Sequence, residues 1–279
     1  MSEHIRARKS LGQNFLVDTG TQRRIVDALD LQPDDTVVEI GPGQGALTQH
    51  LVELAARVIV VELDDRLAPL LRERFAAYPG FTLIHGDALE FDPRDHGLDA
   101  ASLKMVGNIP YNITTPLLFH LLERERRPER LVVMVQKEVA TRITAPPGGS
   151  DYGALTVGIQ SVAATERLFT VPRGAFRPVP GVDSAVVRIT PLVPPRLGAQ
   201  EEIDLRTLTR TMFAWRRKQV QKILRASPLY ELPAEVLQTV LAESETTPDA
   251  RPETLAPDRF IALARSLRNQ GFPREHVAT

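Results

Sequence analysis

Short apolar, β-branched runs recur through the first half of the chain, and they restrict its fold more than any other feature. The runs occupy residues 36–40, 58–62, 82–85, 103–106 and 131–135. Helical spacing separates several of them, with leucines at positions 47, 51 and 54 and apolar residues at positions 67, 71 and 75. Buried strands that alternate with helices indicate a doubly wound, mostly parallel sheet. The sequence therefore predicts an α/β fold.

A proline-rich stretch marks a change in organisation after residue 190. Before it, the run 184–189 predicts one more strand, which we expect to be antiparallel at one edge of the sheet. The stretch 191–198 can continue neither a helix nor a central strand, so it indicates a linker. After it, the apolar spacing is helical throughout. We expect a sheet domain over 1–192, a linker over 193–202 and a small all-α domain over 203–279.

Composition excludes several classes of protein. The chain has no cysteine, which rules out disulfides, thiolate catalysis and cysteine-based zinc sites, and its six histidines show no metal-ligand spacing. We therefore expect no metal. The N-terminus is polar and basic, and no apolar run approaches the ~20 residues of a membrane helix. We expect a cytoplasmic protein with no membrane partner, and a monomer.

The distribution of charge matters more than its sum. The formal net charge of −1 argues against a nucleic-acid binder, because phosphate contacts need positive charge. Basic residues nevertheless cluster at Arg6, Arg8 and Lys9, at Arg124, Arg126, Arg127 and Arg130, and at Arg216, Arg217, Lys218, Lys222 and Arg225. Each cluster fits either a solvated helix face or a phosphate-binding surface, and the sequence leaves both interpretations open.

A glycine loop follows the first apolar run, and two acids follow later runs. Gly41, Gly43 and Gly45 would let the backbone turn tightly and approach a nucleotide-like ligand, although the loop alone also fits a dinucleotide fold or a plain turn. Glu62 ends the next run, where an acid can bond both ribose hydroxyls. Asp87 could accept a hydrogen bond from an adenine amine or cap a helix. Together the five positions favour a cofactor site.

The turn Asn108-Ile109-Pro110-Tyr111, after the run 103–106, combines an amide oxygen, a backbone carbonyl and a flat ring. The Asn108 oxygen and the Ile109 carbonyl could hold an exocyclic amine by its two N–H groups and turn its lone pair toward an electrophile. Such alignment can supply ~7–11 kcal/mol without a strong base. Proline at 110 stiffens the turn. Tyr111 and Phe176 could stack on the two faces of a base, although Phe176 also fits an ordinary core aromatic.

Several longer motifs carry a family resemblance. The segments 38–48 (VEIGPGQGALT) and 61–64 (VELD) resemble the S-adenosylmethionine site of class I methyltransferases. Within that group, the chain is similar to the ribosomal RNA adenine dimethylase family. The motifs that carry this similarity are 10–16 (SLGQNFL), 86–88 (GDA), 106–112 (VGNIPYN), 136–140 (QKEVA), 152–155 (YGAL) and 176–184 (FRPVPGVDS).

The resemblance implies a Rossmann-like, seven-stranded sheet and assigns roles to individual residues. It implies that Asn14 and Leu16 cover S-adenosylmethionine from the N-terminal arm and that Gly41 approaches the amino-acid end of the cofactor. It further implies that Glu62 holds the ribose, that Asp87 holds the adenine, and that Asn108 lies near the sulfonium methyl.

The resemblance also implies a substrate. The expected reaction is transfer of methyl groups to N6 of two adjacent adenines near the 3′ end of 16S ribosomal RNA, in the immature small subunit, giving N6,N6-dimethyladenine. One alternative is a 23S rRNA adenine methylase of the macrolide-resistance type, which shares the 108–111 turn. The segments 115–122 and 178–187 resemble the small-subunit enzymes more. A second alternative is an assembly factor that acts mainly by binding.

Overall fold

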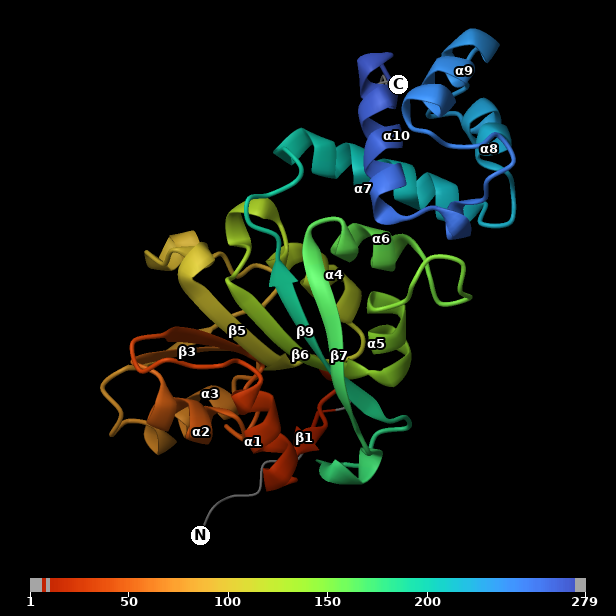
Figure 1. Cartoon of the computed structure of the whole chain (residues 1–279). Coiled ribbons are helices and arrows are strands. Elements are labelled where there is room, and N and C mark those ends of the chain that lie inside the picture. The colour runs from red at the N-terminus through yellow and green to blue at the C-terminus, as the bar shows by residue number, and fades with distance from the viewer. Residues whose placement is uncertain (1–6, 9–10, 274–279) are drawn as a thin grey trace. The chain divides into compact units, whose positions relative to one another are not determined.

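The chain folds into two compact units, which we describe separately from a computed structural model. The structure describes residues 7, 8 and 11–273. Arg6, Lys9 and Ser10 of the motifs above lie outside the described residues, as does the side chain of Arg124. The first unit runs up to residue 140 and resumes over 164–191, and the second comprises 141–163 and everything from residue 192 onward (Figure 1).

The first unit contains a seven-stranded sheet in the order β4-β3-β2-β5-β6-β9-β7. Its strands are β2 (Thr36–Ile40), β3 (Arg57–Glu62), β4 (Phe81–His85), β5 (Leu103–Asn108), β6 (Arg130–Gln136), β7 (Ala163–Val171) and β9 (Ser184–Pro191). β2 pairs in parallel with β3 and β5, β3 with β4, and β5 with β6, whereas β9 is antiparallel to β6. The predicted α/β class, with a mostly parallel sheet, is confirmed.

The expected position of the last strand was wrong in one respect. β9 is antiparallel, as predicted, but β7 forms the edge and β9 lies between β6 and β7. Most of β9 is buried, whereas β7 alternates between buried, half-buried and exposed residues. Charged residues at Glu166 and Arg167 hide this edge strand in the sequence, because a strand that is partly exposed to water lacks a continuous apolar run.

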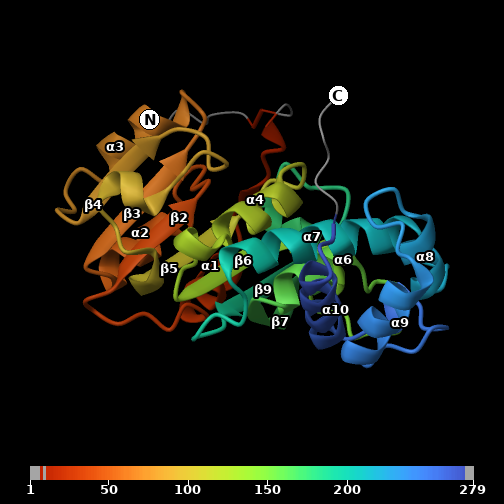
Figure 2. The ribbon, with the colours of Figure 1, turned by 90° about the horizontal axis from the view of Figure 1, so that it is seen from above.

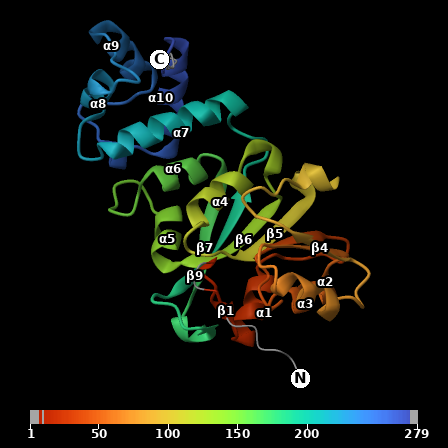
Figure 3. The same ribbon diagram turned by 180° about the vertical axis from the view of Figure 1, so that it is seen from behind.

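Helices cover the sheet and explain why its strands are apolar on both faces. They are α1 (Thr19–Asp27), α2 (Thr48–Leu54), α3 (Leu67–Arg74), α4 (Thr114–Leu121) and α5 (Lys137–Ile143). Ile25 and Leu51 belong to one buried cluster with Val58 and Val60. Ile59, which must point to the opposite face, is buried too. Figures 1 and 3 show α1, α2 and α3 grouped together beside the β2–β4 side of the sheet.

A short antiparallel pair ties the N-terminal segment to the chain just before β9. β1 (Phe15–Leu16) pairs with β8 (Phe176–Arg177), with Leu16 opposite Phe176. The Val17 amide extends this pairing by donating to the Ala175 carbonyl at 2.8 Å. Because Leu16 and Phe176 both join the core of the first unit, the N-terminal segment is held against the body of the fold at this point.

The second unit is helical. It contains α6 (Ala154–Gln160), α7 (Ala199–Ala214), α8 (Val220–Ala226), α9 (Ala234–Glu243) and α10 (Pro257–Asn269), and Figure 2 shows α8 beside α9. A single-turn 3₁₀ helix at Pro252–Thr254 also belongs to this unit. The first unit has four such helices among the described residues, at Pro93–His96, Ala100–Ser102, Arg124–Arg126 and Arg173–Ala175. α7 begins at Ala199, inside the segment that the proline-rich composition marks as a linker. Within the part of the chain that the structure describes, no helix is both long and apolar enough to cross a membrane.

Arg216 holds a loop of the second unit to the residues that precede α10. Its Nε lies 2.7 Å from Glu253 Oε2, while Nη1 and Nη2 donate to the carbonyls of Ser150 and Gly149, each at 2.7 Å. The neighbouring Arg217 is exposed and makes no such bonds among the described residues. The two adjacent arginines therefore have different roles, although the sequence places them in one basic cluster.

Replacing Arg216 is expected to destabilise the helical unit. Arg216→Ala should lower the free energy of unfolding by about 1–3 kcal/mol, because two carbonyls and a carboxylate lose their donors. The half-exposed ion pair itself adds little. Trp215, the only tryptophan, provides a local fluorescence signal for urea unfolding. Arg217→Ala is the matched control and should change stability by less than about 0.5 kcal/mol. Equal losses in both variants would contradict the assignment.

Candidate active site

Parallel register brings the predicted site residues to one edge of the sheet. Ile40 pairs with Val61 on one side and with Gly107 on the other. The next residue along each strand is therefore Gly41, Glu62 or Asn108, and the three positions lie side by side at the carboxyl ends of the strands. A cavity of about 380 Å³ opens here, a size typical of small-molecule sites.

Gly41 and Gly43 have backbone conformations that allow a ligand to approach the loop closely. Gly41 and Gly43 have φ of +63° and +58°, in the left-handed region that favours glycine. No atom lies within 4 Å of a Cβ built on Gly41, so its backbone faces open space in the cavity. The Phe15 ring of the N-terminal segment lies 3.1 Å from the corresponding point on Gly43. Both glycines line the cavity, as the sequence predicts.

Gly45 lies elsewhere. It is not among the residues that line the cavity. Its φ is +81°, and a Cβ at this position would come within 2.7 Å of the Phe75 ring and 3.2 Å of Leu71. Gly45 therefore permits the loop to pack against α3 and its end, which is the role of the third glycine in many nucleotide-binding loops. The structure does not bring it together with the other predicted cofactor residues.

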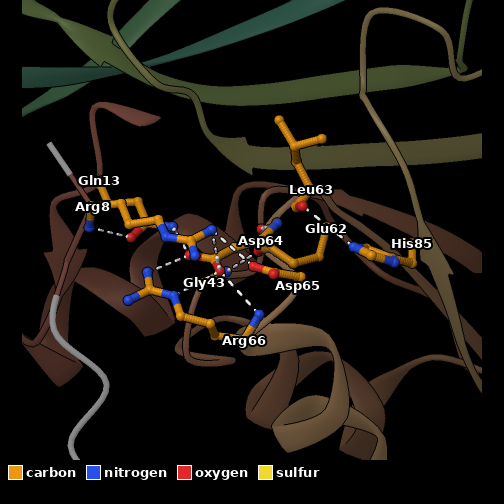
Figure 4. Close-up of polar contacts among 9 residues, drawn as sticks. All are labelled: Arg8, Gln13, Gly43, Glu62, Leu63, Asp64, Asp65, Arg66 and His85. Atoms are coloured by element: carbon orange, nitrogen blue, oxygen red, sulfur yellow. Dashed lines mark hydrogen bonds and ion pairs between the residues drawn. The ribbon is translucent and has the colours of Figure 1, made fainter. Parts of the chain in front are cut away.

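Glu62 is held in place by the backbone around it. Its Oε2 accepts from the Gly43 amide at 3.1 Å and its Oε1 from the Asp64 amide at 2.8 Å (Figure 4). Burial raises the pKa of the Glu62 carboxyl, and these backbone hydrogen bonds oppose that rise. A carboxylate oxygen has two lone pairs, so each oxygen can still accept from a ligand hydroxyl. The arrangement fits a ribose that presents two adjacent hydroxyls.

Asp87 stabilises a turn and lines the cavity, while its contact with an adenine amine stays a prediction. Its Oδ1 accepts from the Leu89 amide at 2.9 Å, so it stabilises the turn after β4. Its side chain also lines the cavity. Because a carboxylate has a second oxygen, one side chain can stabilise the turn and still accept a hydrogen bond from an amine.

Asn108 and Ile109 present two acceptors at the end of β5. Asn108 Nδ2 donates to the Asn14 carbonyl at 3.0 Å, which orients the amide and leaves Oδ1 without a partner among the described residues. The Ile109 amide donates to the Met134 carbonyl at 3.1 Å. The Pro110 carbonyl accepts from Ile113 and Thr114, while the Ile109 carbonyl accepts no hydrogen bond from the described residues. Residues 108–111 all line the cavity.

The two predicted stacking rings are in different environments. Tyr111 lines the cavity, and its hydroxyl lies 2.9 Å from Ser184 Oγ at the start of β9. Burial raises the pKa of Tyr111 above its ordinary value, and the hydrogen bond with Ser184 opposes this rise. Phe176 is only 1% exposed, packs in the core and does not line the cavity. The structure does not bring Phe176 together with Tyr111, and stacking of Phe176 on a base stays a prediction.

The N-terminal segment forms one wall of the site. Asn14 and Leu16 line the cavity, as the resemblance implies, together with the other residues from Leu11 to Val17. The Leu16 carbonyl accepts from Gln22 Nε2 at 3.0 Å. This second contact fixes the segment to α1 in addition to its pairing with β8.

Glu39 is a cavity-lining residue that sequence reasoning missed. It is 2% exposed, and its Oε2 accepts from Thr48 Oγ1 at 2.6 Å. Burial raises the pKa of Glu39 to about 8, the hydrogen bond from Thr48 opposes this rise, and the nearby Glu62 charge adds to it. Burial therefore favours the neutral form of the Glu39 carboxyl. A charged residue inside the apolar run 36–40 is the signal that could have identified it.

The described residues contain no group of three or more histidine, aspartate or glutamate side chains placed to hold a metal ion. The cavity is instead lined by a glycine loop, buried acids and carbonyl or amide acceptors. Such a set can bind a nucleoside through its hydroxyls and amine, and it can hold a second amine at Asn108. These residues fit the cofactor that the sequence predicts.

Comparisons with known proteins agree with this arrangement. The model of the family described as ribosomal RNA adenine dimethylase matches residues 4–265. A ribosomal RNA small subunit methyltransferase A from Geobacter metallireducens is 45% identical over 273 residues, covering 96% of this chain and 98% of that protein.

Two solved structures are similar as well. A dimethyladenosine transferase from Plasmodium falciparum has a TM-score of 0.81 and 26% identity, and the match covers 92% of this chain and 98% of that one. The 23S rRNA methyltransferase ErmE has a TM-score of 0.70 and 29% identity, with 91% of this chain and 100% of that chain covered.

The packing role of Gly45 can be tested against its predicted cofactor role. Gly45→Ala should lower the free energy of unfolding by about 2–4 kcal/mol, since it combines left-handed strain with a clash against Phe75. Gly97→Ala is the matched control, because Gly97 also has a positive φ of +65° but open space around its Cβ. It should cost only about 1 kcal/mol. Lost cofactor binding at unchanged stability would instead support direct contact.

Proposed function

The chain belongs to the ribosomal RNA adenine dimethylase family, and from this membership we propose that it methylates two adjacent adenines near the 3′ end of 16S ribosomal RNA. It is an S-adenosylmethionine-dependent enzyme. The adenines lie in a hairpin loop of the immature small subunit, and N6,N6-dimethyladenine is the product. The pair of acceptors at Asn108 and Ile109 is the observation that carries the proposal, because it matches the two N–H groups of an adenine amine.

Cofactor binding is assigned to the acids and glycines at the strand ends. Glu62 would accept from the ribose hydroxyls, Asp87 from the adenine amine, and the Gly41 backbone would lie along the amino-acid end. When bound, S-adenosylmethionine supplies a methyl group on a positively charged sulfur that takes up electrons as the carbon–sulfur bond breaks. Asn14 and Leu16 would cover this group from the N-terminal segment. The observed cavity lining supports each of these placements.

The chain acts on the target base mainly by alignment. The adenine amine is a weak nucleophile because its lone pair is delocalised into the ring. Acceptance of its two N–H bonds by Asn108 Oδ1 and the Ile109 carbonyl turns the lone pair out of the ring plane, toward the methyl. Tyr111 would stack on the base, and its hydrogen bond to Ser184 holds the ring in position. Once the nitrogen has gained the methyl it is positively charged and acidic, so it can release one proton to water and no strong base is required.

The choice of ribosomal subunit rests on sequence similarity over the whole chain. The small-subunit relative is 45% identical, whereas the 23S rRNA methyltransferase is 29% identical over a similar length. The segments 115–122 and 178–187 favour the small-subunit enzymes as well. A role in assembly through binding alone is the second alternative, and the complete set of acceptors in the cavity supports catalysis over it. We further propose a cytoplasmic location and a monomer, in keeping with a ribosomal RNA substrate.

The helical unit offers basic residues that are not used internally. Arg216 donates to the Ser150 carbonyl within the helical unit. Two arginines of the first unit are also used internally: Arg127 donates to the Leu122 carbonyl and Arg130 to the Leu29 carbonyl. In contrast, Arg217, Lys218, Lys222 and Arg225 are exposed and make no ion pair among the described residues, and Trp215 beside them is 41% exposed. We propose that this surface contacts ribosomal RNA phosphates, with Trp215 available for stacking.

The role of Asn108 is tested by turnover and product. The wild-type enzyme with under-methylated small subunits should give N6,N6-dimethyladenine at adjacent loop positions, detected by mass spectrometry. Asn108→Ala should reduce kcat about 100-fold or more, because one of two aligned acceptors is lost, while RNA affinity stays near that of the wild type. Asn269→Ala, an exposed asparagine at the end of α10, is the control. Modification confined to large-subunit RNA would support the resistance-type alternative.

The RNA surface is tested by salt dependence. The double variant Arg217→Ala with Lys218→Ala should bind small subunits more weakly, and each lost phosphate contact should reduce the log–log salt slope by ~0.7–0.9. A charge-matched control replaces Arg23 and Arg72, which are exposed on helices of the first unit. An equal slope in wild type and in the Arg217/Lys218 variant would place the RNA contacts elsewhere.

A further inference from the structure

The segment Leu11–Val17, here called the strap, forms one wall of the cavity and is anchored at its C-terminal end. All seven of its residues line the cavity. Its last residues are held by pairing of β1 with β8 and by the bond from Val17 to the Ala175 carbonyl. Gln22, which is 4% exposed, holds the Leu16 carbonyl. This end of the strap is therefore fixed by several buried contacts.

The other end of the strap is held by a single buried carboxylate. Gln13 Nε2 donates to Asp64 Oδ2 at 2.9 Å, and Gln13 Oε1 accepts from the Arg8 amide at 2.7 Å (Figure 4). Arg8 Nη1 lies 2.8 Å from Asp65 and 3.3 Å from Asp64. The side chain of Arg8 is 39% exposed and that of Asp65 is 67% exposed, whereas that of Asp64 is inaccessible. Asp64 is therefore the strongest anchor that the structure describes here.

Asp64 is itself firmly positioned. Arg66 contacts it through Nη2 at 2.6 Å and through its amide at 3.0 Å, and the guanidinium keeps the pKa of Asp64 well below its usual range. The Asp64 amide donates to Glu62 Oε1. The residue whose carboxylate holds the strap is thus two positions from the proposed ribose acid, and its backbone amide is bonded to that acid. Asp64 does not line the cavity, so it does not reach a bound ligand directly.

The strap in turn determines the orientation of Asn108. A backbone carbonyl only accepts hydrogen bonds, so the contact between Asn108 Nδ2 and the Asn14 carbonyl requires the Asn108 amide to point its nitrogen at the strap. Oδ1 is then available to a ligand. Asn14 directly follows Gln13. Displacement of Gln13 from Asp64 would move this carbonyl and free the Asn108 amide to rotate, which would exchange its acceptor for a donor.

We propose that Asp64 and Gln13 form a latch that holds the strap closed and thereby sets the amide orientation of Asn108. Asp64 is a positioning residue for the methyl transfer, and this inference rests on the proposed function. The simpler interpretation is that Asp64 only stabilises the turn before α3, a role in which Oδ1 accepts from the Arg66 amide. The latch uses Oδ2 and a residue 51 positions away, so the two roles can be separated.

Variants that exchange the hydrogen-bond donor and acceptor between positions 13 and 64 separate the latch role of Asp64 from its role in the turn. Gln13→Glu places two carboxylates together and should open the strap, whereas Asp64→Asn keeps the shape of the side chain but loses its charge. The double variant pairs an asparagine N–H with a glutamate oxygen, which can still accept from the Arg8 amide. Arg66 is one-third exposed and can turn its Nη2 away from the new amide. A side chain that only stabilises the turn gains nothing from a glutamate at position 13.

Two measurements report on the latch. Without cofactor, hydrogen exchange of strap amides should rise about tenfold or more in each single variant, because a charge-assisted bond is lost. In methylation assays at saturating RNA and cofactor, kcat should fall about 10- to 100-fold from misplacement of Asn108. Relative to the single variants, the double variant should show strap-amide exchange about tenfold slower and kcat about tenfold higher. Unfolding midpoints measured alongside should vary independently of kcat.

Controls make each outcome decisive. Asp65→Asn removes only the exposed partner of Arg8 and should leave exchange and kcat within about twofold of the wild type. Gln13→Ala removes the latch from the strap side without touching the core, so it decides the matter if a position-64 variant fails to fold. Unchanged strap exchange in Gln13→Ala, or no recovery in the double variant, overturns the latch. Absence of adenine methylation by the wild type would instead overturn the proposed function, while strap exchange would still decide the latch.

Discussion

Parallel pairing of β2 with β3 and with β5 is the constraint on which the rest of the site depends. Because Ile40 lies opposite both Val61 and Gly107, the residues that follow in the three strands emerge at one edge with no loop needed to gather them. The glycine loop, the acid at Glu62 and the acceptor at Asn108 thus owe their proximity to backbone hydrogen bonds deep in the sheet. A one-residue slip in either pairing would turn a site side chain to the opposite face.

The sequence was most informative where burial is complete and least where side chains meet over long distances. The central strands were predicted to within one or two residues because both faces are buried. β7 was missed because an edge strand carries charges, and Gly45 was assigned to the cofactor because its contact with Phe75 is not visible in a local motif. Phe176 was expected to stack on the target base. Its pairing through β8 places the ring in the core and outside the cavity lining, so that role stays a prediction.

Basic clusters in a sequence overstate the surface that is available to RNA. Arg126 pairs with Glu123 and Asp92, and Arg216 holds a loop. These guanidinium groups are paired with carboxylates or donate to backbone carbonyls, so they add little to the long-range attraction of RNA. The exposed residues at the end of α7 and on α8 have no such partners among the described residues. Near-zero net charge can therefore coexist with a local surface suited to phosphates.

The bond that orients Asn108 ends on a main-chain carbonyl, and this has an evolutionary consequence. No substitution at position 14 can delete that acceptor, because every amino acid carries it. A point mutation at position 14 therefore leaves the hydrogen bond to Asn108 in place, whereas a change in chain length can break it. An insertion or deletion between residues 11 and 16 would shift which carbonyl meets the amide. The length of the chain between residues 11 and 16 is therefore a constraint on this segment in addition to the side chain of Gln13.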